Sequence, residues 1–321
     1  MPENHYYYQG FNEVLQRKIP QRTALVNTIT DILAIDKDAV YRRLRGDVNF
    51  SFIEMALLAK NLGISIDGIV GIETGQSKPT LVNITRHHNP TQVDYRMFND
   101  YINYLKHIKD DPETILLASG NKLPHYFFYD YEYITRFYTL IWSHASSLGT
   151  IVPYHEIIIP EQMRTLQQEC CYYSRQIKSA HYVWDRTIFQ RIVENIKFFT
   201  RIRLIKAEDV ALLKNDLTTL LNQIENTAIT GMHEDTGNQV FIYISDIYIE
   251  TNYSSIKTQN TMLSQFNAFL LAAISAFDEA VYTEISSWML ALQRWSTLIS
   301  VSGEKMRTEF FNTQRKIIDT L

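Results

Sequence analysis

Along most of the chain, apolar residues recur three to four positions apart, the spacing that places them on one face of an α-helix. The first such stripe beyond residue 90 comprises Tyr95, Phe98, Ile102, Leu105 and Ile108. The same spacing predicts further helices over residues 131–146, 160–179, 185–205, 207–227, 258–275, 278–299 and 303–321. The apolar run Ala268–Phe277 within these is interpreted as a buried helix. We therefore expect a mainly α protein.

Two stretches depart from the helical spacing. They are "ETILLAS" at 113–119 and "GNQVFIYISDIYIETNYSSIK" at 237–257, both dense in β-branched residues or aromatic residues that favour strands. The second stretch predicts a small β-hairpin with its turn near Ser245-Asp246. Because residues 240–243 are consecutive apolar residues, we expect both faces of this strand to be covered.

A segment rich in Gly, Pro, Ser, Thr and Asn, "ETGQSKPTLVNITRHHNPTQ", shows neither helical nor strand periodicity. It predicts a linker between two domains. The expected organisation is a first domain over residues 1–75, a linker over 76–95 and a larger helical domain over 96–321.

The first domain carries clear signals for the ends of its helices. Pro20 precedes the helical pattern "QRTALVNTITDIL", and Asp36 is placed to cap the next helix, "KDAVYRRLRG", which Gly46 ends. Ser51 and Glu54 have the spacing of a capping box at the start of a further helix. Residues 65–70 predict one more short turn of helix.

This order of short helices resembles the lambda-repressor/Cro-type (XRE-like) helix-turn-helix domain over roughly residues 10 to 72. The residues that carry the resemblance are "ITDILAIDKDAVYRRLRG" and "SFIEMALLAKNLGISIDGI". The resemblance implies that Ile35 and Val40 are buried. It also implies that the DNA-facing residues are Asp36, Lys37, Asp38, Tyr41, Arg42 and Arg45.

The sequence departs from the family pattern at three places. Thr30 and Ala34 stand where the family usually has Ala and Gly, and Arg43-Leu44 stands where it has an apolar residue and then an acid. The last departure predicts that Leu44 turns inward and that Arg43 is free for solvent or phosphate, so Arg43 joins the candidate DNA-binding residues.

Physical arguments can be made both for and against DNA binding by this predicted helix. Arginine can donate two hydrogen bonds to guanine in the major groove, into which an α-helix fits. However, the formal net charge is −4, so any basic surface must be local. A basic run taken alone is more often a solvated helix face, and a helix-turn-helix fold can also serve protein contacts.

The remaining chemistry-bearing residues match no known catalytic pattern. The sequences "RHHNP" and "MHEDTG" lack the spacing of a metal site, and no phosphate-binding glycine loop or nucleophile elbow is present in the sequence. The aromatic segment "PHYFFYDYEYITRFYTLIW" is open to two interpretations, a hydrophobic core or the lining of a ligand pocket, and the core is preferred. We expect no enzyme activity, no cofactor and no metal.

The only two cysteines of the sequence, Cys170 and Cys171, are adjacent and cannot link distant segments by a disulfide bond. The sequence shows neither a signal peptide nor an apolar run long enough to cross a membrane. These features predict a cytoplasmic protein.

The C-terminal segment "SSWMLALQRWSTLISVSGEKMRTEFFNTQRKI" is similar to the ends of bacterial proteins with an N-terminal helix-turn-helix. We therefore expect a transcriptional regulator that binds double-stranded DNA as a homodimer, with a small-molecule effector left open. The alternative is a protein-interaction adaptor.

Overall fold

The computed structural model describes residues 3–64, 66, 69, 83–86, 92–146, 152–269 and 272–321. The chain forms two compact units, Met1–Leu81 and Val82–Leu321, each with its own hydrophobic core. The boundary between them lies inside the predicted linker 76–95. Most of that linker lies outside the described residues, but β1 (Asn83–Arg86) falls within it and pairs with a strand of the second unit.

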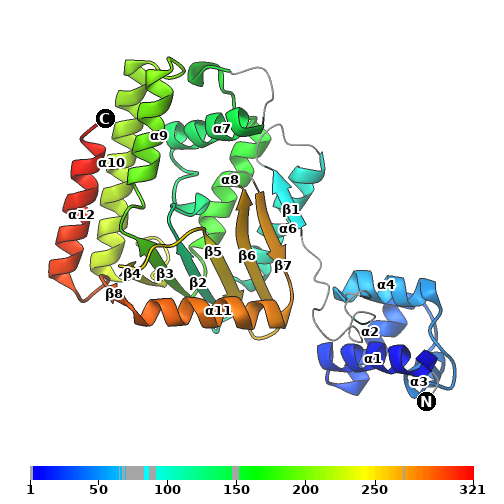
Figure 1. Cartoon of the computed structure of the whole chain (residues 1–321). Helices are drawn as coiled ribbons and strands as arrows, with labels where there is room; N and C mark the ends of the chain where they lie inside the picture. The colour runs from blue at the N-terminus through cyan, green and yellow to red at the C-terminus, as the bar shows by residue number, and fades with distance from the viewer. Residues whose placement is uncertain are drawn as a thin grey trace. The chain divides into compact units, whose positions relative to one another are not determined.

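The first unit is helical. It contains α1 (Glu3–Lys18), α2 (Arg22–Leu33), α3 (Lys37–Arg45) and α4 (Phe52–Leu62), labelled in Figure 1. Its fully buried side chains include one or two from each helix: Leu15, Leu25, Ile29, Val40 and Leu58. The short fifth helix predicted over residues 65–70 lies mostly outside the described residues.

The capping signals of this unit behave as predicted. The Asp36 carboxylate accepts a hydrogen bond from the Ala39 N–H at 2.7 Å, and Gly46 ends α3 with φ of 82°. Ser51 and Glu54 form the predicted capping box at the start of α4. These local bonds satisfy backbone groups that a helix leaves unpaired at its ends, so the sequence alone places α3 and α4 accurately.

The second unit is an α/β domain, and the prediction of a mainly α protein with one small hairpin is wrong. The helices of this unit are α6 (Gln92–Ile108), α7 (Glu132–Ser146), α8 (Glu161–Ser174), α9 (Gln190–Arg201), α10 (Ala207–Thr230), α11 (Glu279–Arg294) and α12 (Glu304–Ile318). Its strands after β1 are β2 (Ile115–Gly120), β3 (Ser179–Asp185), β4 (Gln239–Ser245), β5 (Tyr253–Lys257), β6 (Met262–Phe269), β7 (Ala272–Ala276) and β8 (Ser296–Leu298).

These strands form one eight-stranded sheet in the order β1-β7-β6-β5-β2-β3-β4-β8. The central strands β2, β3 and β4 are parallel, while all other pairings are antiparallel. The pairing therefore changes from parallel to antiparallel at β2, which has β3 on one side and β5 on the other. In open α/β sheets, ligands commonly bind outside the carboxyl ends of the parallel strands.

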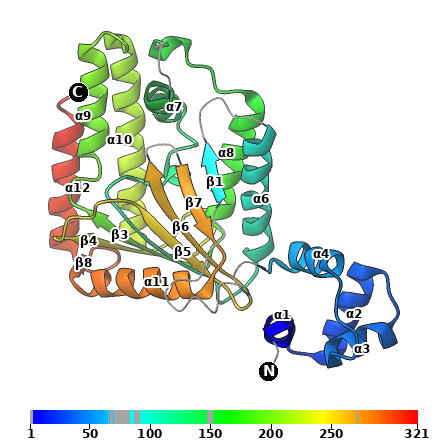
Figure 2. The same cartoon turned by 45° about the vertical axis from the view of Figure 1, so that its right-hand side comes forward.

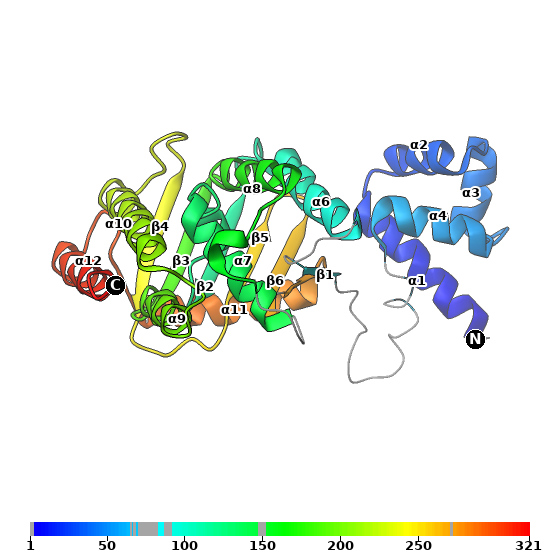
Figure 3. The same ribbon diagram turned by 90° about the horizontal axis from the view of Figure 1, so that it is seen from above.

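Helices cover both faces of the sheet. On one face, alternate residues of the parallel strands, such as Ala118, Tyr182 and Ile242, join one core with α6, α8, α9, α10 and α12. Figure 2 shows α9, α10 and α12 grouped beside β4, and Figure 3 shows α6 and α8 further along the sheet. On the other face, Val183 and Tyr243 pack toward α11, which runs across β2 to β6 (Figure 1). The expectation that both faces of the 240–243 strand are covered is confirmed.

The predicted hairpin over 237–257 is wrong, although both of its strands exist. β4 pairs with β3 and β8, whereas β5 pairs with β2 and β6. The segment between them crosses the ends of β3 and β2 and is anchored there by the buried Ile249, which contacts Val183. A tight turn at Ser245-Asp246 cannot form, because two strands lie between β4 and β5.

The helix predicted over 258–275 is also wrong, as is the buried helix at 268–277. This part of the chain forms β6 and β7, which pair with each other in antiparallel register. The register shifts between Asn267 and Phe269, and such a bulge interrupts the alternation that identifies a strand in a sequence. A short apolar run then has no periodicity that separates a strand from a buried helix.

Candidate functional site

Three of the predicted DNA-binding residues lie exposed at the start and middle of α3. They are Lys37, Asp38 and Arg42, and the structure records no hydrogen bond or ion pair for the side chains of Lys37 and Arg42 among the described residues. Together with Asp36 and Ala39, they line a shallow hollow in the surface. These two cations are therefore available to a partner without breaking an internal contact.

Two other predicted residues are exposed but already engaged. The Asp36 carboxylate caps α3, as described above, and Arg45 forms an ion pair with Asp47 in which Nη2 and Oδ2 lie 2.8 Å apart. The Arg45–Asp47 pair is about half exposed on both sides. Exposed ion pairs contribute little to stability, so Arg45 can leave Asp47 for a phosphate at low cost.

Arg43 is not free for solvent or phosphate, contrary to the prediction. Its guanidinium makes two hydrogen bonds to the Glu54 carboxylate, from Nε at 3.2 Å and from Nη2 at 2.8 Å, and both side chains are only 18% exposed. Burial opposes ionisation of Glu54, but the hydrogen bonds from Arg43 and from the Ser51 N–H outweigh it, so the pKa of Glu54 is lowered. Arg43 therefore ties α3 to the start of α4.

Tyr41 is also less available than predicted. It is half-buried and packs against the core of the first unit, as does Leu44. The inward position of Leu44 is the one that the sequence predicts. Because Leu44 and Tyr41 both contact the core, the exposed face of α3 is narrower than the sequence suggests and centres on Arg42.

Thr30 and Ala34 differ from the Ala and Gly of the helix-turn-helix pattern that the sequence resembles, and the structure shows how each is accommodated. Ala34 ends α2 in the left-handed conformation, with φ of 52°, which glycine adopts more easily than alanine. The hydroxyl of Thr30 is buried and has no hydrogen-bond partner among the described residues. Ala34 therefore carries backbone strain at the turn between α2 and α3, and Thr30 places an unpartnered hydroxyl in the preceding helix.

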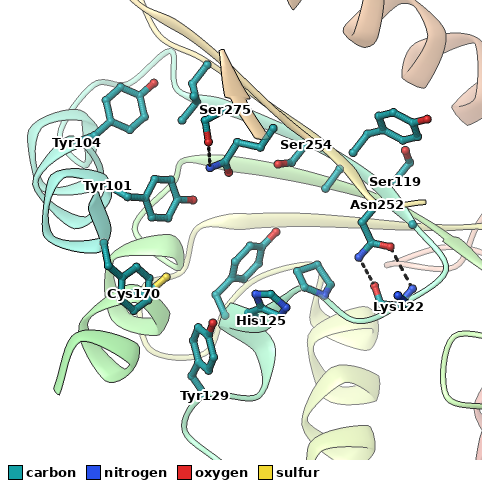
Figure 4. Close-up of a pocket in the computed structure, with 18 of the residues that line it drawn as sticks. Tyr101, Tyr104, Ser119, Lys122, His125, Tyr129, Cys170, Asn252, Ser254 and Ser275 are labelled. Carbon is teal, nitrogen blue, oxygen red and sulfur yellow. Dashed lines mark hydrogen bonds between the residues drawn. The ribbon is translucent and has the colours of Figure 1, made fainter. Parts of the chain in front are cut away.

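A second candidate site lies in the α/β unit and was not located from the sequence. It is a cavity of about 290 Å³ beside the carboxyl end of β2, between the sheet and α6. Figure 4 shows Tyr101 and Tyr104 projecting from α6 on one side, with Lys122 and Asn252 on the other and His125 and Tyr129 below. The aromatic segment that begins at Pro124 supplies part of the lining of this cavity, while Phe128 and Trp142 of the same segment are core residues.

Asn252 fixes the loop that follows β2. Its Oδ1 accepts the N–H groups of Asn121 and Lys122 at 3.2 and 3.3 Å, and its Nδ2 donates to the Lys122 carbonyl at 2.9 Å. A Cβ on Gly120 would lie 2.4 Å from that Oδ1, so only glycine admits this close approach. The Asn121 side chain in turn donates to the carbonyls of Ile249 and Glu250, which fastens the loop to the β4–β5 connection.

Burial shifts the pKa values of several titratable groups in the cavity towards their neutral forms. Burial raises the pKa of the Tyr101 and Tyr129 hydroxyls well above their usual range and that of the Cys170 thiol to about 12. Burial, and then the nearby Arg191 charge, lower the pKa of Lys122. The buried part of the lining is therefore rich in uncharged phenols, with Lys122 at the end nearest the loop after β2 and the exposed Asp100 on α6.

Neither a metal site nor a membrane span is found in the part of the chain that the structure describes. No group of three or more His, Cys, Asp or Glu residues is placed there to hold an ion. Cys170 and Cys171 are buried free thiols. No described helix combines the length and the apolar character needed to cross a bilayer.

Comparison of this chain with models of protein families, with curated proteins and with solved structures found no match.

Proposed function

We propose that this chain is a sequence-specific DNA-binding regulator of transcription that acts in the cytoplasm, with α3 as its recognition helix. The observation that carries the proposal is a short helix, capped at both ends by Asp36 and Gly46, whose outward Lys37 and Arg42 have no side-chain partner in the described part of the chain. A helix with two such cationic side chains fits the major groove, where base edges and phosphates can accept their hydrogen bonds.

The exposed residues divide by role in this proposal. Arg42, at the centre of the exposed face, reads a guanine through two hydrogen bonds. Lys37 and Arg45 contact phosphates, Arg45 by exchanging Asp47 for a phosphate oxygen. Arg43 has no DNA contact in this proposal, because its pair with Glu54 ties α3 to the start of α4.

The α/β unit holds two copies of the chain together in this proposal, because one small helix-turn-helix unit rarely reaches specific affinity alone. A twofold dimer would place the two α3 helices on half-sites about 34–36 Å apart, one turn of DNA. No catalytic step is assigned to either unit.

The test is selection of bound sequences from a random double-stranded DNA library with the full chain, followed by titration of the best site. Arg42→Ala is expected to weaken binding about 10- to 100-fold and to relax preference at one base position. Lys305→Ala, a matched exposed cation in the other unit, should bind as the parent does. Failure to enrich any sequence would reject the proposal, as would an unchanged motif and affinity for Arg42→Ala.

A second candidate is a protein-interaction adaptor, and one observation favours it. Phe52 and Ile53 at the start of α4 are 74% and 70% exposed, which is unusual for adjacent large apolar residues. In that case Phe52→Ser would abolish partner binding and Arg42→Ala would not. Salt dependence also separates the two, because release of counterions makes the DNA affinity fall steeply as salt rises.

A further inference from the structure

The cavity beside β2 has the size and lining of a small-molecule site. Its volume of about 290 Å³ lies near the lower end of the range usual for ligand pockets, and most of its lining is aromatic or aliphatic. The contributing segments come from α6, from β2 and the loop after it, from α8, and from β5 to β7, so one folded domain builds the whole site.

Tyr129 is one of several residues in this lining whose buried hydroxyl has no hydrogen-bond partner among the described residues. The Tyr129 side chain is 5% exposed, and its hydroxyl makes no hydrogen bond among the described residues. Leaving a buried hydroxyl unsatisfied costs about 1–3 kcal/mol, so such groups usually have a partner. The Tyr129 ring lines the cavity, where a bound molecule can supply that partner (Figure 4).

The charge of the cavity is unbalanced at one end. No carboxylate among the described residues lies within ion-pair distance of Lys122, and Arg191 is the neighbouring charge that lowers its pKa. Asp100 also lines the cavity but is exposed on α6, the element that carries Tyr101 and Tyr104 on the side away from Lys122 (Figure 4). An anion bound near Lys122 would therefore relieve a repulsion between two cations.

The loop after β2 argues for a carboxylate and against a phosphate. Phosphate sites in α/β proteins use a row of free backbone N–H groups in a glycine-rich loop. Here the N–H groups of Asn121 and Lys122 are both occupied by the Asn252 Oδ1. Because Lys122 is not accompanied by a row of free N–H groups, the site favours a singly charged anion over a phosphate.

We propose that this cavity binds a small aromatic carboxylate. Its ring lies among Tyr101, Tyr126 and Tyr129, and its carboxylate faces Lys122. The Tyr129 hydroxyl donates a hydrogen bond to the same anion or to a ring substituent. Aromatic side chains on several sides favour a flat ring, because edge-to-face and offset contacts add to the apolar burial.

Calorimetric titration of the full chain without DNA tests this proposal, with phenylacetate, its neutral amide phenylacetamide and the saturated cyclohexylacetate as probes. Phenylacetate is expected to bind at one site per chain, at least tenfold more tightly than either of the other two. Because DNA is absent, this outcome is independent of whether the first unit binds DNA.

Two variants assign the binding to this cavity. Lys122→Met keeps the length and apolar stem of the side chain, and it should weaken phenylacetate binding at least tenfold while leaving phenylacetamide unchanged. Lys305→Met is the matched control in an exposed position and should change neither. A thermal melt of Lys122→Met, expected to match the parent, confirms that the variant is folded.

Three results would overturn the proposal. The first is no heat of binding for phenylacetate up to about 10 mM, which is weaker than any useful affinity. The second is equal affinity for the acid and the amide, which would remove the role of charge. The third is equal affinity for phenylacetate and cyclohexylacetate, which would remove the preference for an aromatic ring.

Discussion

The two units of this chain present recognition surfaces of opposite kinds. The first unit offers a narrow, exposed face on one short helix, where Lys37 and Arg42 point to solvent and the neighbouring Arg43 is used to hold the helix in place. The second unit forms a partly open cavity whose lining comes from several helices and strands and includes the half-buried Lys122. An exposed face suits a large, highly charged partner, whereas a concave cavity suits a small one.

The units also differ in how their recognition groups are held. Local bonds place α3, because Asp36, Gly46, Ser51 and Glu54 all act within a few residues of their own helix ends. The cavity instead depends on Asn252, which bonds to residues 130 and 131 positions earlier in the chain. Loss of the Asn252 bonds should therefore affect the second unit alone. The four tryptophans all lie in that unit, so their fluorescence reports its unfolding selectively.

The largest expected effect is that of Asn252→Ala on the second unit. The change leaves two partly buried N–H groups and one carbonyl without their partner, which should lower the free energy of unfolding by about 3 kcal/mol. Urea unfolding followed by tryptophan fluorescence measures it. Asn260→Ala, at an exposed position in the β5–β6 turn, should be neutral. A loss below about 0.5 kcal/mol for Asn252→Ala would show that water replaces these bonds freely.

The next effect is a difference in acid sensitivity between the units. Burial, partly offset by Asp235, lowers the pKa of His233 from 6.5 to about 4. In the unfolded chain His233 is protonated below about pH 6.5, whereas in the folded unit it stays neutral down to about pH 4. The folded unit therefore loses stability across that window as the pH falls. At pH 5 the loss should reach about 2 kcal/mol, because each unit of pH is worth about 1.36 kcal/mol. Burial also lowers the pKa of His181, which adds to the same trend.

The first unit should behave differently over this range. The pKa of Glu54 is lowered from 4.5, so its contribution is complete above that pH and is lost only as the pH falls further. Tryptophan fluorescence should therefore show the second unit losing stability between pH 6.5 and 4.5, while the protection of the α3 and α4 amides, measured relative to the intrinsic exchange rate at each pH, stays constant. His233→Gln should flatten the pH dependence of the second unit. A parent protein with equal stability at pH 7 and pH 5 would contradict the assignment to buried histidines.

The same contrast explains which parts of the molecule could be predicted from the sequence. The ends of α3 and α4 could be predicted because a cap and its partner lie three residues apart. The partner of β5 could not be predicted, because β2 lies more than a hundred residues away and no turn connects the two. Strands buried on both faces, such as β3 and β4, also lack the alternation that separates a strand from a buried helix.

The candidate sites follow the same division. The exposed Lys37 and Arg42 could be predicted because they lie on one helix whose inward residues are evident. The engagement of Arg43 could not, because its partner Glu54 was already assigned to the capping box and serves both roles. The cavity residues Tyr101, Lys122 and Tyr129 come from separate elements, and only the aromatic density after Pro124 gave a signal.

The smallest expected effect is a gain of stability in the first unit from Ala34→Gly. Ala34 is exposed and adopts φ of 52° and ψ of 42°, where an alanine Cβ is strained by about 1–2 kcal/mol. Glycine removes that strain but adds freedom to the unfolded chain, so a net gain of about 0.5–1 kcal/mol is expected. Amide exchange of the α2 and α3 protons measures this gain.

The matched control is Ala24→Gly, inside α2, which should instead lower the free energy of unfolding by about 1 kcal/mol. If the turn serves only to position α3, DNA affinity should stay within a factor of two of the parent. A destabilised Ala34→Gly protein would mean that contacts of the Ala34 methyl group outweigh its backbone strain, and the departure from glycine at this turn would then be favourable rather than costly.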